Sequence, residues 1–156
     1  MSSIESVVIR FYEGFVKKDS SQMAECYADT VTFSDPVFPN LKGEEARKMW
    51  RMLCSNGKDL KVTYEILASN DSEVYVHWDA YYTFSGTGRK VHNSINTVMT
   101  VKDGLITKHQ DQFNFWKWSS QALGPIGILL GWTPFLQAKI QAKAKKSLER
   151  FQSTGN

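Results

Sequence analysis

The sequence contains little cysteine and no long apolar run. Its two cysteines, Cys26 and Cys54, form no CxxC pair and have no histidine at metal-ligand spacing, which argues against a disulfide framework, a redox motif or a zinc site. Buried free thiols fit a reducing compartment. No segment approaches the roughly 18 apolar residues of a membrane span, and the N-terminus lacks a secretory signal pattern. We therefore expect a cytoplasmic protein with no membrane partner, metal or other cofactor.

Basic residues only slightly outnumber acidic residues. The chain has 19 basic and 16 acidic residues, a net charge of +3, which does not imply nucleic acid. Aromatic residues are not interleaved with a basic stripe, and the sequence carries no nucleophile motif. The glycines of segment 85–88 mark a hairpin turn and do not open a helix, so a phosphate-binding loop is not expected. These absences leave a small molecule or a protein as the expected partner.

Aromatic residues are abundant, at 13% of the 156 residues. They can fill a core, or some can line a cavity for an apolar ligand. The length suits one domain, and we treat residues 1–156 as a single domain in which 119–156 form a C-terminal helical extension. Helices are predicted from Ser2 to Lys18, over 19–27 and over 44–55, with a strand at 30–34.

Four alternating segments follow and read as strands, at 59–68, 73–84, 90–101 and 105–116. The short turns between them make neighbouring strands antiparallel. Helices followed by a meander indicate the α+β class. We expect a cone-shaped, curved, mostly antiparallel sheet with the N-terminal helices over a pocket.

The tail departs from this regularity. Segment 121–132 is apolar and broken by glycines, and Pro134 opens a last helix that runs to about Gln152. One face of this helix carries five basic residues against Glu149. A solvated basic face is the first interpretation, with attachment to a membrane surface as the alternative. The apolar segment needs cover, either as a lid on the cavity or on a second subunit.

The most informative stretch is 27–37, Tyr-Ala-Asp-Thr-Val-Thr-Phe-Ser-Asp-Pro-Val. With the order of elements up to about Trp118, it resembles the ketosteroid isomerase and SnoaL-like branch of the nuclear transport factor 2-like superfold. The resemblance implies a hollow cone that hosts isomerases, cyclases, epoxide hydrolases and non-catalytic binders, so the fold does not settle the function.

Asp35 aligns with the aspartate that moves a proton in the isomerases. Such a base needs an apolar surrounding that raises its pKa, together with donors aimed at the developing oxyanion. Phe11 stands where the isomerases have a tyrosine, and Asn96 or Thr97 stands where they have an acid. Asn96 or Tyr12 could donate if either faces inward. Steroid isomerisation itself is therefore not expected.

The last strand places His109, Asp111 and Phe113 on one face. In SnoaL-like cyclases and epoxide hydrolases this strand supplies pocket acids, so the resemblance implies a second functional carboxylate at Asp111, which His109 could assist. The alternative is an exposed polar face on which the two residues form a surface pair.

Three hypotheses follow: an isomerase- or cyclase-type enzyme, a non-catalytic binder of a small apolar molecule, and a dimerisation module. The third is compatible with either of the others, and a homodimer is expected. The predicted catalytic residues are Asp35, Asp111 and His109. The predicted ligand-binding residues are Tyr12, Phe11, Trp50, Trp78, Asn96 and Phe113.

Overall fold

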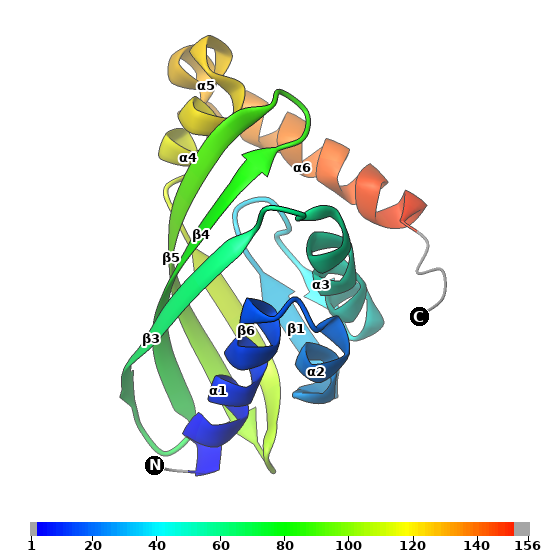
Figure 1. Cartoon of the computed structure of the whole chain (residues 1–156), viewed down its shortest axis with the longest axis vertical. Helices are drawn as coiled ribbons and strands as arrows, with labels where there is room; N and C mark the ends of the chain where they lie inside the picture. The colour runs from blue at the N-terminus through cyan, green and yellow to red at the C-terminus, as the bar shows by residue number, and fades with distance from the viewer. Residues whose placement is uncertain (1–2, 152–156) are drawn as a thin grey trace.

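A computed structural model describes residues 3–151. It contains one six-stranded, strongly curved sheet in the order β2-β1-β6-β5-β4-β3, with helices packed on its concave side (Figure 1). The strands are β1 (Tyr27–Ser34), β2 (Leu41–Lys42), β3 (Lys61–Ser69), β4 (Glu73–Phe84), β5 (Arg89–Lys102) and β6 (Leu105–Gln112). Only the β1–β6 pair is parallel among these strands. The predicted α+β class and the mostly antiparallel sheet are confirmed.

The first three helices, α1 (Ser3–Val16), α2 (Ser20–Glu25) and α3 (Glu44–Asn56), precede and interrupt the strands as predicted. The Asp19 side chain accepts the Gln22 backbone N–H at 3.1 Å and caps α2. The second helix is shorter than expected, because the chain enters β1 at Tyr27 directly after the cap of α2 at Cys26.

The register of the sheet brings two distant carboxylates together. In the parallel pair, Phe33 lies opposite His109 and Ser34 lies opposite Gln110. The next residue on the first strand is Asp35, where the chain leaves β1, and the next residue on β6 is Asp111. Because parallel strands advance together, this register places Asp35 beside Asp111 at one end of the sheet.

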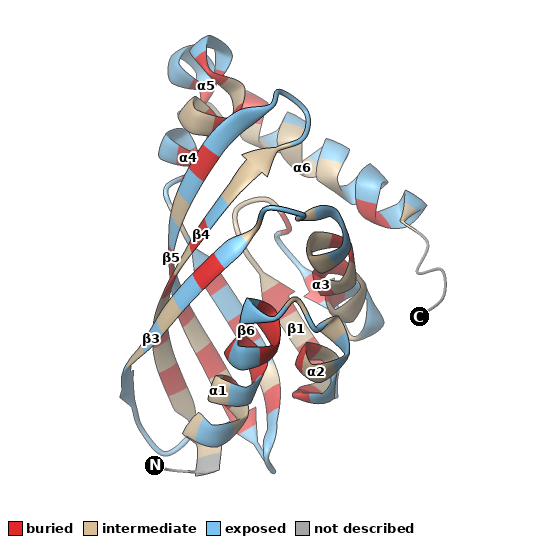
Figure 2. Ribbon diagram, in the orientation of Figure 1, coloured by how far each residue is buried: buried red, intermediate tan, exposed pale blue. Residues whose placement is uncertain are grey.

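The inner face of the sheet and the helices enclose a core of aromatic rings. Side chains alternate along β4, so that Trp78 is buried while His77 and Asp79 lie on the outer face, as period two predicts. Figure 2 shows the buried positions collected between the sheet and α1 to α3. The largest fully buried rings are Tyr12, Tyr27, Phe11, Phe15 and Phe33.

The tail differs from the prediction in two ways. The last strand ends at Gln112, because the Asn114 side chain accepts the Lys117 backbone N–H at 3.0 Å and starts a helix. The expected irregular segment is helical: α4 (Phe115–Leu123) and α5 (Pro125–Leu130) precede α6 (Pro134–Arg150). The extra C-terminal helix is confirmed, and helical structure begins at Phe115, four residues before 119.

A small second cluster attaches the tail to the sheet. Val91 of β5 packs with Phe115, Trp118 and Ala122 of α4. Gly127 of α5 is buried against α4, and a Cβ atom there would overlap the Ser119 carbonyl oxygen. The close approach of α5 to α4 therefore depends on glycine at this position.

Gly127→Ala should push α5 away from α4, because neither backbone can yield to the added methyl group. We expect a destabilisation of roughly 1–3 kcal/mol, with faster hydrogen exchange confined to α4 and α5. Ile126→Ala, at an adjacent and exposed position, is the control and should change stability by less than about 0.5 kcal/mol. Equal effects of the two substitutions would contradict the packing argument.

Candidate functional site

Asp35 lies in the loop after β1 and is partly exposed. Its Oδ1 accepts the backbone N–H groups of Val37 at 2.7 Å and Phe38 at 2.6 Å. The next residue is also held, because the Pro36 carbonyl accepts the Nε2 groups of Gln137 at 3.1 Å and Gln141 at 3.0 Å. The carboxyl is thus fixed from its own loop and, through Pro36, from α6.

The surroundings of Asp35 favour its protonated form. Burial raises the pKa of Asp35 to about 7, and the nearby negative charge of Asp111 adds to the rise. The two backbone N–H groups oppose the rise but do not cancel it. A carboxyl with a pKa near 7 can both accept and return a proton at neutral pH, as a general acid–base catalyst must.

Asp111 terminates a chain of buried hydrogen bonds. Trp50 Nε1 donates to the Tyr27 hydroxyl at 2.7 Å, which contacts His109 Nδ1 at 2.7 Å. His109 Nε2 in turn lies 2.8 Å from Asp111 Oδ1. His109 is fully buried and Asp111 is 4% exposed. The alternative of an exposed surface pair is therefore wrong.

A second arm reaches Asp111 from β4 and β5. Trp78 Nε1 donates to Thr97 Oγ1 at 2.9 Å, and Thr97 Oγ1 donates to Asp111 Oδ1 at 2.6 Å. Both residues are buried. The same carboxylate oxygen thus accepts from Thr97 and from His109.

The order of donors and acceptors along the hydrogen-bonded chain from Trp50 assigns the tautomer of His109. Because the Tyr27 hydroxyl accepts the Trp50 N–H, its own proton is free to be donated to Nδ1. The imidazole proton then resides on Nε2 and points at Asp111. Every hydrogen bond in both arms is therefore donated in the direction of Asp111, whose Oδ1 accepts the last one in each arm.

Tyr12 is the one described residue with a buried side-chain oxygen or nitrogen that lacks a hydrogen-bond partner. Its hydroxyl lies near Thr97 and Asp111, and burial raises its pKa well above the usual value. An unpaired buried hydroxyl costs free energy. Tyr12 thus offers an unused donor beside Asp111, whereas neighbouring Phe11 offers none.

The deep part of the cone is filled by the protein itself. Phe11 and Tyr12 have no accessible surface and Trp50 has 2%, so these three side chains are almost completely enclosed by protein atoms. Phe11 stacks on Tyr27 at 5.3 Å between ring centroids, and Trp50 stacks on His109 at 5.7 Å. In this conformation these predicted ligand-binding residues form core and do not line a cavity.

Asn96 does not reach the interior, which corrects that part of the prediction. It is exposed on the outer face of β5, and its Oδ1 lies 2.9 Å from His77 Nδ1. The inward position belongs to Thr97, the other register considered. A one-residue change of register exchanges the two faces of a strand.

Four partly exposed side chains lie near the ends of β1 and β6, and we call them the mouth residues: Asp35, Val37, Tyr82 and Phe113. Val37, Tyr82 and Phe113 pack on both apolar clusters. Trp118 Nε1 donates to the Tyr82 hydroxyl at 2.7 Å. Burial raises the pKa of Tyr82, and the charge of Asp35 contributes. Tyr82 was missed from the sequence because its proximity to Asp35 is set by strand pairing, whereas Val37 is close because it follows in the same loop.

The model of the SnoaL-like domain matches residues 8–109, about two thirds of the chain. The chain belongs to the SnoaL-like domain family. The match ends at His109 on β6, so α4, α5 and α6 lie beyond the matched region. No curated protein matches the chain.

Solved structures share the fold of this SnoaL-like protein at low identity. IdmH from Streptomyces antibioticus, a proposed polyketide cyclase, has a TM-score of 0.64 at 19% identity over 76% of this chain and 96% of its own. An LEH-like epoxide hydrolase of M. tuberculosis has a TM-score of 0.62 at 16% identity over 82% and 96%. An NTF2-like protein of unknown function from Burkholderia pseudomallei has a TM-score of 0.67 at 15% identity over 78% and 98%. The nuclear transport factor 2-like fold is confirmed.

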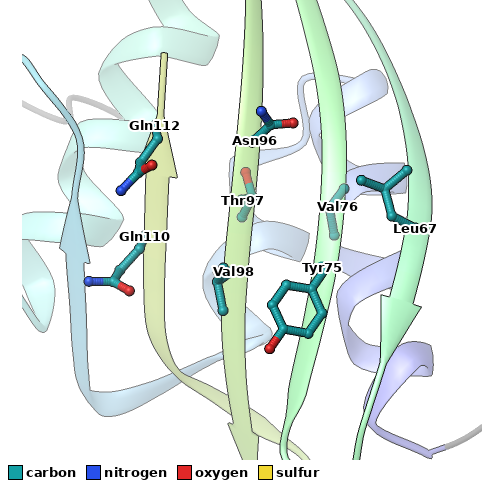
Figure 3. A pocket seen from close by; sticks show the side chains of 8 residues that line it. All are labelled: Leu67, Tyr75, Val76, Asn96, Thr97, Val98, Gln110 and Gln112. Carbon is teal, nitrogen blue, oxygen red and sulfur yellow. The ribbon is translucent and has the colours of Figure 1, made fainter. Parts of the chain in front are cut away.

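The outer face of the SnoaL-like sheet carries a shallow depression of about 200 Å³ over β3 to β6 (Figure 3). Its lining residues are Leu67, Tyr75, Val76, Asn96, Thr97, Val98, Gln110 and Gln112. Asp35 is not among them.

On the same outer face of the sheet, Asp79 pairs with His77 at 3.2 Å and with His92 at 2.9 Å. Within residues 3–151, no group of three or more histidine, cysteine, aspartate or glutamate side chains could hold a metal ion.

Tyr27→Phe should break the chain that orients His109. The change leaves Trp50 Nε1 and His109 Nδ1 without partners in the core, at about 1–3 kcal/mol for each group. We expect the free energy of unfolding in urea to fall by roughly 2–5 kcal/mol. Tyr64→Phe, which removes a surface hydroxyl bonded to Glu13 at 2.6 Å, is the matched control and should cost less than about 1 kcal/mol.

Asp35→Asn should make stability less dependent on pH. The folded-state pKa of Asp35 is about 7 against an ordinary value of 3.8, so the folded protein binds the proton more tightly and loses stability as pH rises from about 4 to 7. The asparagine variant lacks this loss. Above pH 7, its free energy of unfolding should exceed that of the parent by up to about 4 kcal/mol. Asp29→Asn, at a fully exposed side chain, should leave the parent's pH dependence unchanged. Parallel stability curves for the parent and Asp35→Asn would contradict the raised pKa.

Proposed function

We propose that this protein binds a small, largely apolar carbonyl compound at the mouth residues and that Asp35 transfers a proton at the carbon next to the carbonyl group. The observation that carries this proposal is a partly exposed carboxyl with a pKa of about 7 beside apolar side chains. A base of this pKa matches the operating pH, and the apolar rim suits an apolar guest.

The two carboxyl groups have different roles in this proposal. Asp111 accepts from Thr97 and His109, and its negative charge contributes to the raised pKa of Asp35. Asp35 removes the substrate proton and returns it elsewhere on the molecule. Two acids held in different environments are a common basis for dividing acid–base work.

Hydrogen-bond donors for the developing oxyanion come from tyrosines. The Tyr12 hydroxyl has no partner among the described residues, and the Tyr82 hydroxyl lies at the mouth with Asp35. Tyr82 accepts a hydrogen bond from Trp118, so its own proton is available to a ligand. Tyr82 is accessible now, whereas Tyr12 requires the core to open.

The comparisons support this chemical class. IdmH is a proposed polyketide cyclase and the M. tuberculosis protein is an epoxide hydrolase, and acid–base chemistry on apolar compounds is common to such activities. The alternative function is non-catalytic binding of an apolar molecule. The filled interior favours this alternative, because a ligand confined to the mouth residues can be bound without touching Asp111 or the residues hydrogen-bonded to it.

Solvent exchange tests the proposal without knowledge of the product. Apolar aromatic ketones that raise the melting temperature would be incubated with the protein in D₂O, and deuterium uptake next to the carbonyl measured by mass spectrometry. The parent should catalyse uptake, with a rate that rises with pH to a plateau above about 7, because the base must be deprotonated.

Asp35→Asn should retain ligand binding and lose exchange by about 100-fold or more. Asp29→Asn is the control for removal of a carboxylate and should exchange at the parent's rate. Binding without exchange by the parent would favour the non-catalytic alternative. Undiminished exchange by Asp35→Asn would refute the assignment of the base.

A further inference from the structure

The tail exposes a group of large apolar side chains, which we call the α5 cluster. Its most exposed members are Trp132 at 72%, Leu129 at 70% and Phe135 at 67%. The others are Ile126, Ile128, Leu130 and Trp116, between 41% and 59% exposed. Seven large apolar side chains exposed within residues 116–135 are more than the single exposed residues of ordinary protein surface, and they indicate an interaction surface.

The polar atoms of this cluster are already satisfied. Trp132 Nε1 donates to the Leu129 carbonyl at 3.0 Å, and Trp116 Nε1 donates to the Ile128 carbonyl at 3.0 Å. Both indole rings can therefore leave water without an unpaired N–H group, which would otherwise oppose transfer to an apolar medium.

The chain segment that carries the α5 cluster has charge of one sign. Residues 112–148 contain no aspartate or glutamate and carry five lysines. Lys117 and Lys139 adjoin the cluster, and the Lys139 ammonium lies 5.8 Å from the Phe135 ring. Lys143, Lys145 and Lys146 extend the charge along α6. An apolar tip bordered by lysines complements a bilayer with anionic headgroups.

The position of the cluster also fits a flat partner. Helix α5 forms one end of the elongated molecule, with α4, the start of α6 and the β4–β5 hairpin next to it (Figures 1 and 2). No helix in the described chain is long and apolar enough to cross a membrane. Because α5 lies at one end of the molecule, the cluster is placed where it can meet a flat surface such as a bilayer.

A second copy of the chain fits this surface less well. A symmetric dimer through the α5 cluster would bring the lysines of 112–148 together with no acid in either segment to offset them. Like charges placed opposite each other oppose such an interface. The anionic headgroups of a bilayer would instead attract these lysines.

We propose that the α5 cluster is a membrane-docking surface that inserts Leu129, Trp132 and Phe135 at the headgroup boundary of anionic bilayers. The surrounding lysines contact the headgroups. From the sequence we expected a solvated basic face and no membrane partner, with surface attachment as the alternative. The exposed apolar group on α5 favours that alternative.

Flotation with vesicles tests this proposal. The full-length protein should float with vesicles of phosphatidylcholine and phosphatidylserine, float weakly with phosphatidylcholine alone, and be released as the salt concentration rises. Trp132→Ala with Phe135→Ala should weaken binding about tenfold or more. Lys139→Gln with Lys143→Gln should weaken it about fivefold for each charge.

Matched controls are Leu67→Ala, an apolar side chain 56% exposed on β3, and Lys61→Gln on the same strand. Both should bind as the parent does. The proposal is overturned if the parent does not float with anionic vesicles, or if the controls lose binding equally. It is also overturned if sedimentation shows a dimer that Trp132→Ala with Phe135→Ala converts to a monomer while vesicles remain unbound.

Discussion

The structure depends on the convergence of buried hydrogen bonds on Asp111. A carboxylate in an aromatic core would be strongly destabilising if it were unpaired. Thr97 and His109 donate to one of its oxygens, and each is oriented in turn by a buried partner. These contacts join β6 to β4, β5, β1 and α3, so the polar network and the ring packing specify one arrangement of the cone.

The contrast between the two acids arises from this network. Asp111 is supplied with side-chain donors, whereas Asp35 receives only two backbone N–H groups from its own loop and lies near a negative charge. Burial and that charge raise the pKa of Asp35 to about 7. The partly exposed carboxyl therefore changes its protonation near neutral pH, as proton transfer to an entering molecule requires.

Local patterns predicted the elements well and the contacts between strands poorly. Alternation put His109 and Asp111 on one face of the last strand, and both are buried. It could not decide between Asn96 and Thr97, since a shift of one residue is invisible until the partner strand is known. Tyr82 was likewise missed, because its position near Asp35 depends on the pairing of distant strands.

Helix α6 connects two regions that would otherwise be independent. Gln137 and Gln141, one helical turn apart, both donate to the carbonyl of Pro36. The N-terminal turn of that helix adjoins the α5 cluster, through Phe135. One helix thus contacts the apolar end of the molecule through Phe135 and the loop that holds Asp35 through its two glutamines.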